Sequence, residues 1–326
     1  MHDVSFIVCP NGFGHFRRFI FVCNELKKNN ITVKIYTDKS KFNNYINSRS
    51  IENNFSIENI SWLPIAQDYK DKNFFLNNFK NLCMKIKSPL IVSDNYIEPL
   101  LFKKDAFVIA NFLFHEEMLN ESDEYFKNLN KIDYEKANIF SSIFAMNYMN
   151  QFKKVQKLSL VGQQYEQLET NDHIILSKGL GCWSDDFDKI VLEYSQKNLS
   201  NYKGIVYIDQ SLIGIMSKLK LIGLSVKLSS FKIDLISRAS AIIGRPSIGI
   251  LTESFEYRIP FIPLVGSNDN ESSNNYSILQ NLYNDINLSF EFQERKKNLS
   301  LLKSALLPLG GQVELVKHII FKLENT

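Results

Sequence analysis

The chain has 326 residues, of which 44% are hydrophobic and 22% are charged, with a formal net charge of +3; these values are those of a soluble globular protein and give no support for a nucleic-acid partner. Its length favours two domains over one, no run approaches the roughly 18 uninterrupted apolar residues of a membrane span, and its four scattered cysteines form no C-x-x-C pair. We therefore expect no metal site, no disulfide framework and no transmembrane helix.

The N-terminal segment alternates stretches typical of strands and of helices. The apolar run at residues 4–9 predicts a buried parallel strand, and residues 31–36 alternate as a second strand would. Between them, Phe19, Val22 and Leu26 recur at helical spacing. This order of strand, helix and strand predicts a parallel pair with a helix on one face.

Polar residues follow the next two predicted strands. The apolar run at residues 90–92 leads into Asp94, and the run at residues 106–110 leads into Asn111. Open parallel α/β sheets bind their ligands at the carboxyl ends of the strands. We therefore expect Asp94 to face a ligand site.

The second half repeats the pattern. Gly179 and Gly181 form a glycine turn, Asp185 or Asp186 could cap the helix that follows, and residues 250–257 predict another helix. Strands are expected at residues 174–176, 204–208, 241–243 and 261–264.

The predicted fold class is α/β, with two Rossmann-like doubly wound domains that face each other across a cleft. A polar stretch around Gln163 lacks apolar periodicity, so we place the domains at residues 1–165 and 166–326. The last helix, at about residues 312–323, could pack on either domain.

The loop after the first strand carries the features of a reactive site. Gly12 and Gly14 let a backbone approach a ligand closely, and His15 opens the following helix. A helix N-terminus favours an anion, and an imidazole takes up protons near neutral pH. We interpret His15 as a catalytic base; the alternative is that it only caps its helix.

Two further residues near this loop have open interpretations. A cation at a helix start opposes the helix dipole, so a phosphate or an acidic partner would explain either Arg17 or Arg18, and plain solvation is the alternative. Asp94 could orient His15 or bind an acceptor hydroxyl; equally, it could cap the next helix.

Two motifs resemble those of the GT-B sugar-nucleotide enzymes. The segment GFGHFRR at residues 12–18 resembles the Gly-x-Gly-His-x-x-Arg signature of that superfamily. The segment IGRPSIGILTESFEYRIPFIPL at residues 243–264 resembles its donor-binding pattern, and residues 274–275 resemble the Asn-bearing segment downstream. In these motifs the chain resembles the N-acetylglucosaminyltransferase of the lipid-linked cell-wall precursor and the UDP-sugar hydrolase of the pseudaminic acid pathway.

The chain departs from the family pattern at three places. Pro246 and Ser247 stand where the family usually has glycine, and residues 258–260 read Arg-Ile-Pro where it has Gly-x-Pro. Residues 269–271 only approximate its Asp/Glu-Gln pair.

The resemblance implies a metal-independent glycosyltransferase, of hexosyl or N-acetylhexosaminyl type, that needs no cofactor and uses a UDP-sugar as co-substrate. From their places in the sequence we expect His15 and Asp94 as catalytic residues, and Gly12, Gly14 and Arg18 as acceptor or phosphate ligands. The implied nucleotide-sugar-binding residues are Gly179, Gly181, Arg245, Ser247, Gly249, Thr252, Glu253 and Asn274. Without the resemblance, Glu253 is an acid at a helix terminus and Arg245 a salt-bridge residue.

The expected partners are the nucleotide-sugar donor and a glycan or lipid-linked acceptor of bacterial surface-glycan synthesis. One alternative is a nucleotide-sugar hydrolase in which His15 activates water, and a second is a non-catalytic nucleotide-sugar-binding subunit. The first strand leaves no room for a signal peptide, so a cytoplasmic location is expected, and peripheral contact with the inner face of the membrane is compatible with the resemblance.

Overall fold

The computed structural model describes residues 2–52, 54–63, 72–111, 132, 136–146, 149, 155–166, 168–179, 184, 186–229 and 233–325. The chain forms two compact units. The first contains Met1–Val161 together with Gly310–Thr326, and the second contains Gly162–Leu309.

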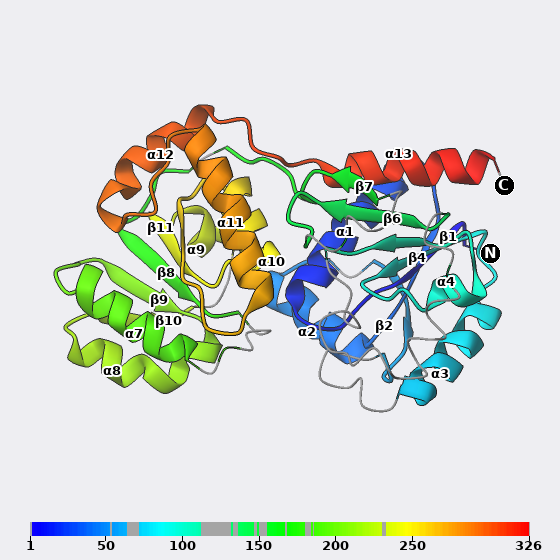
Figure 1. Cartoon of the computed structure of the whole chain (residues 1–326), viewed down its shortest axis with the longest axis horizontal. Helices are drawn as coiled ribbons and strands as arrows, with labels where there is room; N and C mark the ends of the chain where they lie inside the picture. The colour runs from blue at the N-terminus through cyan, green and yellow to red at the C-terminus, as the bar shows by residue number, and fades with distance from the viewer. Residues whose placement is uncertain are drawn as a thin grey trace. The chain divides into compact units, whose positions relative to one another are not determined.

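The first unit is built on a parallel sheet with the strand order β3-β2-β1-β4-β5-β6-β7 (Figure 1). Every pairing between its described strands is parallel. The bounds are β1 Val4–Ile7, β2 Val33–Thr37, β3 Ser56–Asn59, β4 Leu90–Asp94, β5 Phe107–Ile109, β6 Asn138–Ser142 and β7 Val155–Leu158.

Helices cover both faces of this sheet because successive strand side chains point to opposite sides. Phe6 of β1 packs in a core that includes residues of the helices α1, α2 and α13, whereas its neighbour Ile7 packs in a second core with residues of α3 and α4. The bounds are α1 Phe13–Lys28, α2 Lys39–Arg49, α3 Lys72–Lys85, α4 Pro99–Phe102 and α13 Gly311–Glu324.

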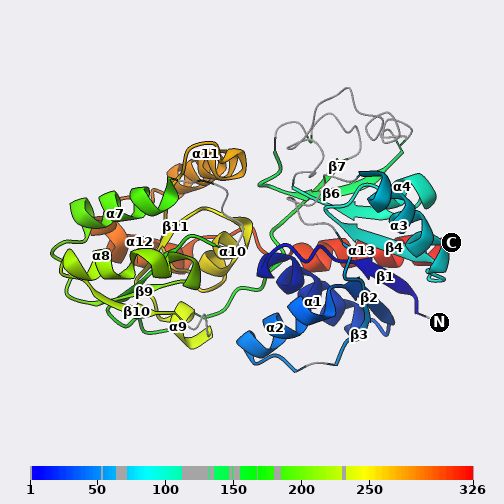
Figure 2. The ribbon, with the colours of Figure 1, turned by 90° about the horizontal axis from the view of Figure 1, so that it is seen from below.

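The helix α13 returns to the first unit after the chain has completed the second. It lies beside α1 in both views (Figures 1 and 2), and it buries Leu315, Val316 and Ile319 in the same core. Glu314 fixes its start, since its carboxylate accepts hydrogen bonds from the backbone N–H (2.9 Å) and hydroxyl (2.7 Å) of Ser159. The first unit is therefore assembled from two distant parts of the sequence.

The second unit holds a parallel sheet with the order β10-β9-β8-β11-β12. The strands are β8 His173–Ser177, β9 Ile205–Ile208, β10 Ser225–Leu228, β11 Ala241–Gly244 and β12 Phe261–Pro263. The α-helices are α7 Phe187–Asn198, α8 Met216–Leu221, α9 Ile233–Ser237, α10 Ile248–Glu256, α11 Asn270–Asp285 and α12 Arg295–Ser304, and the 3-10 helices are η3 Gln210–Ile215 and η4 Phe292–Glu294. The predicted α/β class with two Rossmann-like sheets is confirmed.

Two details differ from the sequence-based expectation. The helix α10 begins at Ile248, two residues before the predicted start. Asp186 stands at the N-cap of α7 but makes no capping hydrogen bond there; its carboxylate accepts from the hydroxyl of Ser184 and from the backbone N–H of Ser267 instead. In the part of the chain that the structure describes, no helix is both long enough and apolar enough to cross a membrane.

Candidate active site

The strand order of the first sheet reverses direction between β1 and β4. The chain winds outward from β1 through β2 and β3, then returns to the other side of β1 at β4. Such a switch point opens a crevice at the carboxyl ends of the two central strands. His15 lies on α1, immediately after β1, and Asp94 is the last residue of β4. The topology alone therefore brings these residues from positions 79 apart in sequence to one place.

His15 and Asp94 form a hydrogen-bonded pair. The ring Nδ1 of His15 is 2.7 Å from Oδ2 of Asp94, which is fully buried, whereas the imidazole is 15% exposed. The backbone N–H of Cys9 also donates to this oxygen, at 3.2 Å. An ionised carboxylate accepts hydrogen bonds only, so Nδ1 carries a proton, and in the neutral form of the ring Nε2 holds the lone pair. The geometry thus suits the neutral ring to act as a base through Nε2.

The guanidinium of Arg18 completes the cluster. Its Nη2 donates to Oδ1 of Asp94 and lies 3.1 Å from Nδ1 of His15. Burial raises the pKa of Asp94, but the charges of Arg18 and His15 and the hydrogen bonds to this carboxylate outweigh it and hold the pKa below its usual value. The predicted contact of Arg18 with an acceptor or a phosphate stays a prediction, because here its side chain is turned to Asp94.

The two glycines of the same loop have different surroundings. Gly12 is the N-cap residue of α1 with φ at 86°, a conformation that costs little only for glycine. Gly14 is exposed in the first turn of α1. This turn has no acidic residue and no side-chain cap, so its positive end is open to an anion.

In the second unit, the turn after β8 is held by a residue that the sequence reasoning missed. Oδ2 of Asp209 accepts from the backbone N–H of Lys178 (2.7 Å) and of Gly179 (3.0 Å), and from the hydroxyl of Ser177 (3.0 Å). Gly179 adopts φ of 76° there. Asp209 follows β9 directly, so the strand-end rule that selected Asp94 could also have found it. Gly181 lies outside the described residues.

The turn after β11 adjoins this one at the switch point of the second sheet. A Cβ atom on Gly179 would lie 4.0 Å from the hydroxyl of Ser247. Ser247 is the N-cap of α10, whose start has no side-chain cap and no acid in its first turn, which includes Gly249. Such an end carries a partial positive charge and free backbone donors.

Arg245 is buried and paired with two carboxylates. Its Nε donates to Oδ2 of Asp269 at 2.7 Å, and its Nη2 donates to Oδ1 of Asp269 at 3.1 Å and to Glu271 at 2.7 Å. Asp269 also caps α11 by accepting from the backbone N–H of Ser272 at 3.0 Å. The structure therefore shows Arg245 as a salt-bridge residue that ties the start of α11 to the turn after β11; its predicted contact with a diphosphate stays a prediction.

The remaining predicted residues lie on α10 and α11. Glu253 and Thr252 are both buried, and the Thr252 hydroxyl donates to the carbonyl of Ile248 at 2.6 Å. Asn274 is half-buried, whereas its neighbour Asn275 is fully buried and donates to the carbonyl of Pro246 at 2.8 Å. Asn275 therefore contacts the turn directly, which the sequence pattern of two adjacent asparagines could not decide. Within the described ranges, no three side chains of His, Cys, Asp or Glu are grouped to hold a metal ion.

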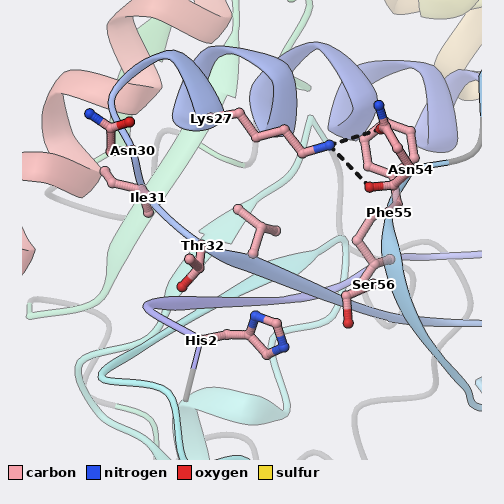
Figure 3. A pocket seen from close by; sticks show the side chains of 10 residues that line it. His2, Lys27, Asn30, Ile31, Thr32, Asn54, Phe55 and Ser56 are labelled. Atoms are coloured by element: carbon pink, nitrogen blue, oxygen red, sulfur yellow. Dashed lines mark hydrogen bonds between the residues drawn. The ribbon is translucent and has the colours of Figure 1, made fainter.

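A hollow of about 440 Å³ lies at the end of the first sheet opposite to the one that carries His15 and Asp94. Figure 3 shows Lys27 bonded to Asn54, with Thr32 and His2 among the other residues that line the hollow. The Lys27 ammonium donates to the side-chain oxygen of Asn54 at 2.8 Å and stands 4.4 Å from the ring centre of Phe55. Because β2 and β3 begin here, this hollow is at the amino ends of the strands, and it contains none of the predicted site residues.

Comparison with solved structures supports the fold assignment. The chain is similar to a UDP-glucose:anthocyanidin 3-O-glucosyltransferase in complex with UDP, with a TM-score of 0.60, 12% identity and 100% of both chains covered. It is also similar to MurG of Acinetobacter baumannii (TM-score 0.56, 12% identity, 98% of this chain and 99% of that one) and to a glycosyltransferase of Rickettsia africae ESF-5 (0.57, 14%, 99% of each). No protein-family model and no curated protein matches the sequence. At these identities the likeness establishes the two-domain GT-B fold.

Proposed function

We propose that this protein is a glycosyltransferase that moves a sugar from a nucleotide-sugar donor, a UDP-sugar, to a hydroxyl group. The observation that carries the proposal is the hydrogen bond of 2.7 Å between His15 and the buried Asp94 at the switch point of the first sheet. This pair supplies an oriented base where open α/β sheets bind their ligands. The fold shared with solved glycosyltransferases supports the same assignment.

In the proposed reaction, Nε2 of His15 removes the proton from the acceptor hydroxyl. The acceptor oxygen then attacks the anomeric carbon, and the bond from that carbon to the nucleoside diphosphate breaks. Asp94 stabilises the imidazolium that forms, since its carboxylate already accepts from Nδ1. A single displacement of this kind inverts the anomeric centre.

The second unit is the proposed site of the donor. The uncapped start of α10, with Ser247 and Gly249, suits the diphosphate because helix N-termini favour anions. The turn at Gly179 lies against Ser247 and borders the same site. Glu253 is proposed to bond the ribose hydroxyls. We propose that the helix terminus, without a metal ion, stabilises the charge that develops on the leaving group.

The proposed acceptor is a glycan or lipid-linked carbohydrate of bacterial surface-glycan synthesis, which is the class that the sequence resemblance favours. The structural similarity to MurG is compatible with this choice of acceptor. Peripheral contact with the inner face of the membrane is part of the same proposal.

The test is the release of UDP from UDP-glucose and UDP-N-acetylglucosamine, with and without a panel of glycoside and lipid-linked acceptors. Release that requires an acceptor supports transfer. Release without an acceptor contradicts it and supports a hydrolase in which His15 activates water. UDP binding without any release contradicts catalysis altogether.

The variant His15→Ala tests whether His15 is the base of the reaction. We expect its turnover to be lost, whereas its affinity for UDP, measured by calorimetry, stays that of the parent protein. Retained turnover would remove His15 from the mechanism.

A further inference from the structure

The carboxylate of Asp94 affects whether His15, the proposed base, is protonated. A carboxylate next to an imidazole favours the protonated ring, and an imidazolium cannot take a proton from a hydroxyl. Asp94 is fully buried, and its Oδ2 lies 2.7 Å from Nδ1 of the His15 ring. An opposing charge beside the ring would be needed to keep it neutral.

Arg18 supplies that charge. Its Nη2 contacts the second oxygen of the same carboxylate and lies 3.1 Å from Nδ1 of His15. Because Nδ1 donates its proton to Asp94, it has no lone pair to accept a hydrogen bond from Arg18. Arg18 therefore acts on the ring through its positive charge, and the two cations compete for one carboxylate.

The other titratable groups near His15 and Asp94 do not place a positive charge against this pair. On β1, burial and the charge of Asp94 raise the pKa of the Cys9 thiol to about 12, so the thiol stays neutral. After β4, burial raises the pKa of Tyr96 well above its usual value, and the nearby Glu98 adds to this. On α1, the guanidinium of Arg17 donates to the carbonyl of Val161 at 3.3 Å. Among the described residues that face the pair, Arg18 is thus the cation in contact with it.

We propose that Arg18 is a positioning residue whose charge offsets that of Asp94, so that His15 stays neutral and can act as a base at neutral pH. The inference rests on the proposed function, in which His15 removes the acceptor proton. It assigns to Arg18 a part in setting the working pH of the enzyme, distinct from the binding of an acceptor or a phosphate.

The experiment measures the pH dependence of kcat/KM for UDP release in the parent protein, Arg18→Gln and Arg18→Lys. In Arg18→Gln the midpoint of the acid limb should move to higher pH by about one unit, which is about a tenfold loss on that limb. Arg18→Lys keeps the charge and should return the limb toward its original position. Arg17→Gln removes an equal charge one residue away, and the limb should move much less.

A second measurement does not depend on turnover. The imidazole of His15 is titrated by NMR in the protein without substrates, with its signal assigned by its loss in His15→Ala. The midpoint should rise in Arg18→Gln by the same amount as the acid limb, and thermal melting confirms that each variant is folded.

Two results would overturn the inference about Arg18: an unchanged or lowered NMR midpoint in Arg18→Gln, or equal effects of the Gln and Lys substitutions. If the parent protein releases no UDP under any condition, the proposed function fails, and the NMR titration still decides whether Arg18 sets the protonation of His15.

Discussion

Replacing Asp209 with alanine tests how the turn after β8 is held. The change removes the acceptor of three hydrogen bonds, from Ser177, Lys178 and Gly179, and the cap of η3, where Asp209 accepts from the backbone N–H of Ser211 at 3.0 Å. Three bonds at about 1 kcal/mol each and a cap worth about 1 kcal/mol give a loss of about 4 kcal/mol. Part of this loss is offset because the variant no longer buries a carboxylate. We therefore expect the free energy of unfolding to fall by about 2–4 kcal/mol.

The assay is urea unfolding followed by circular dichroism, together with calorimetric titration with UDP. Asp188→Ala is the matched control, because Asp188 bonds the Lys178 ammonium at 2.8 Å on the surface without contacting the turn's backbone. This control should cost less than about 1 kcal/mol. We expect weaker UDP binding in Asp209→Ala and parental binding in the control. The reasoning would be refuted if both variants had equal stability and equal affinity for UDP.

Three other expectations concern the second unit and the reaction. Glu253→Ala should weaken UDP binding, measured by calorimetry, and an unchanged affinity would remove Glu253 from the donor site. Arg258 has φ of 57° where the family has glycine, and its guanidinium bonds the carbonyls of Leu302, Lys303 and Ala305 at the end of α12. Arg258→Gly and Arg258→Ala both lose these bonds, but only glycine relieves the backbone, so in chemical unfolding the Gly variant should be more stable than the Ala variant by about 1 kcal/mol. Chelation with EDTA should leave UDP release unchanged; a rate that fell and recovered on adding Mg²⁺ would contradict the proposed role of α10.

Most of the inner strands could be predicted from the sequence, as could the edge strand β12, whereas the inner strand β6 could not. Strands such as β1, β4, β8 and β11 are buried on both faces, so they appear as short apolar runs. The strands β3, β7 and β10 gave no such signal. They are sheet edges with exposed positions and polar residues, as in Ser56–Asn59, so no apolar run marks them.

Part of the candidate site could be predicted, because local sequence marks some of its residues. Asp94 stands at the end of a strand and His15 follows a glycine loop, and each can be recognised from the local sequence. The pairing of Arg18 with Asp94 joins residues 76 apart, and that of Asp209 with Gly179 joins residues 30 apart. Such contacts depend on which strands are neighbours, which local patterns do not specify. Likewise, the apolar face of α13 predicts that it packs, but not that its partner is α1.

The return of α13 to the first unit has a consequence for biosynthesis. Residues 4–158, which carry β1 to β7, leave the ribosome well before Leu315, Val316 and Ile319 have been made. Until those side chains arrive, part of α1 has no cover and presents apolar surface, which favours aggregation. The core of the first unit is therefore completed only after all of the second unit has been synthesised.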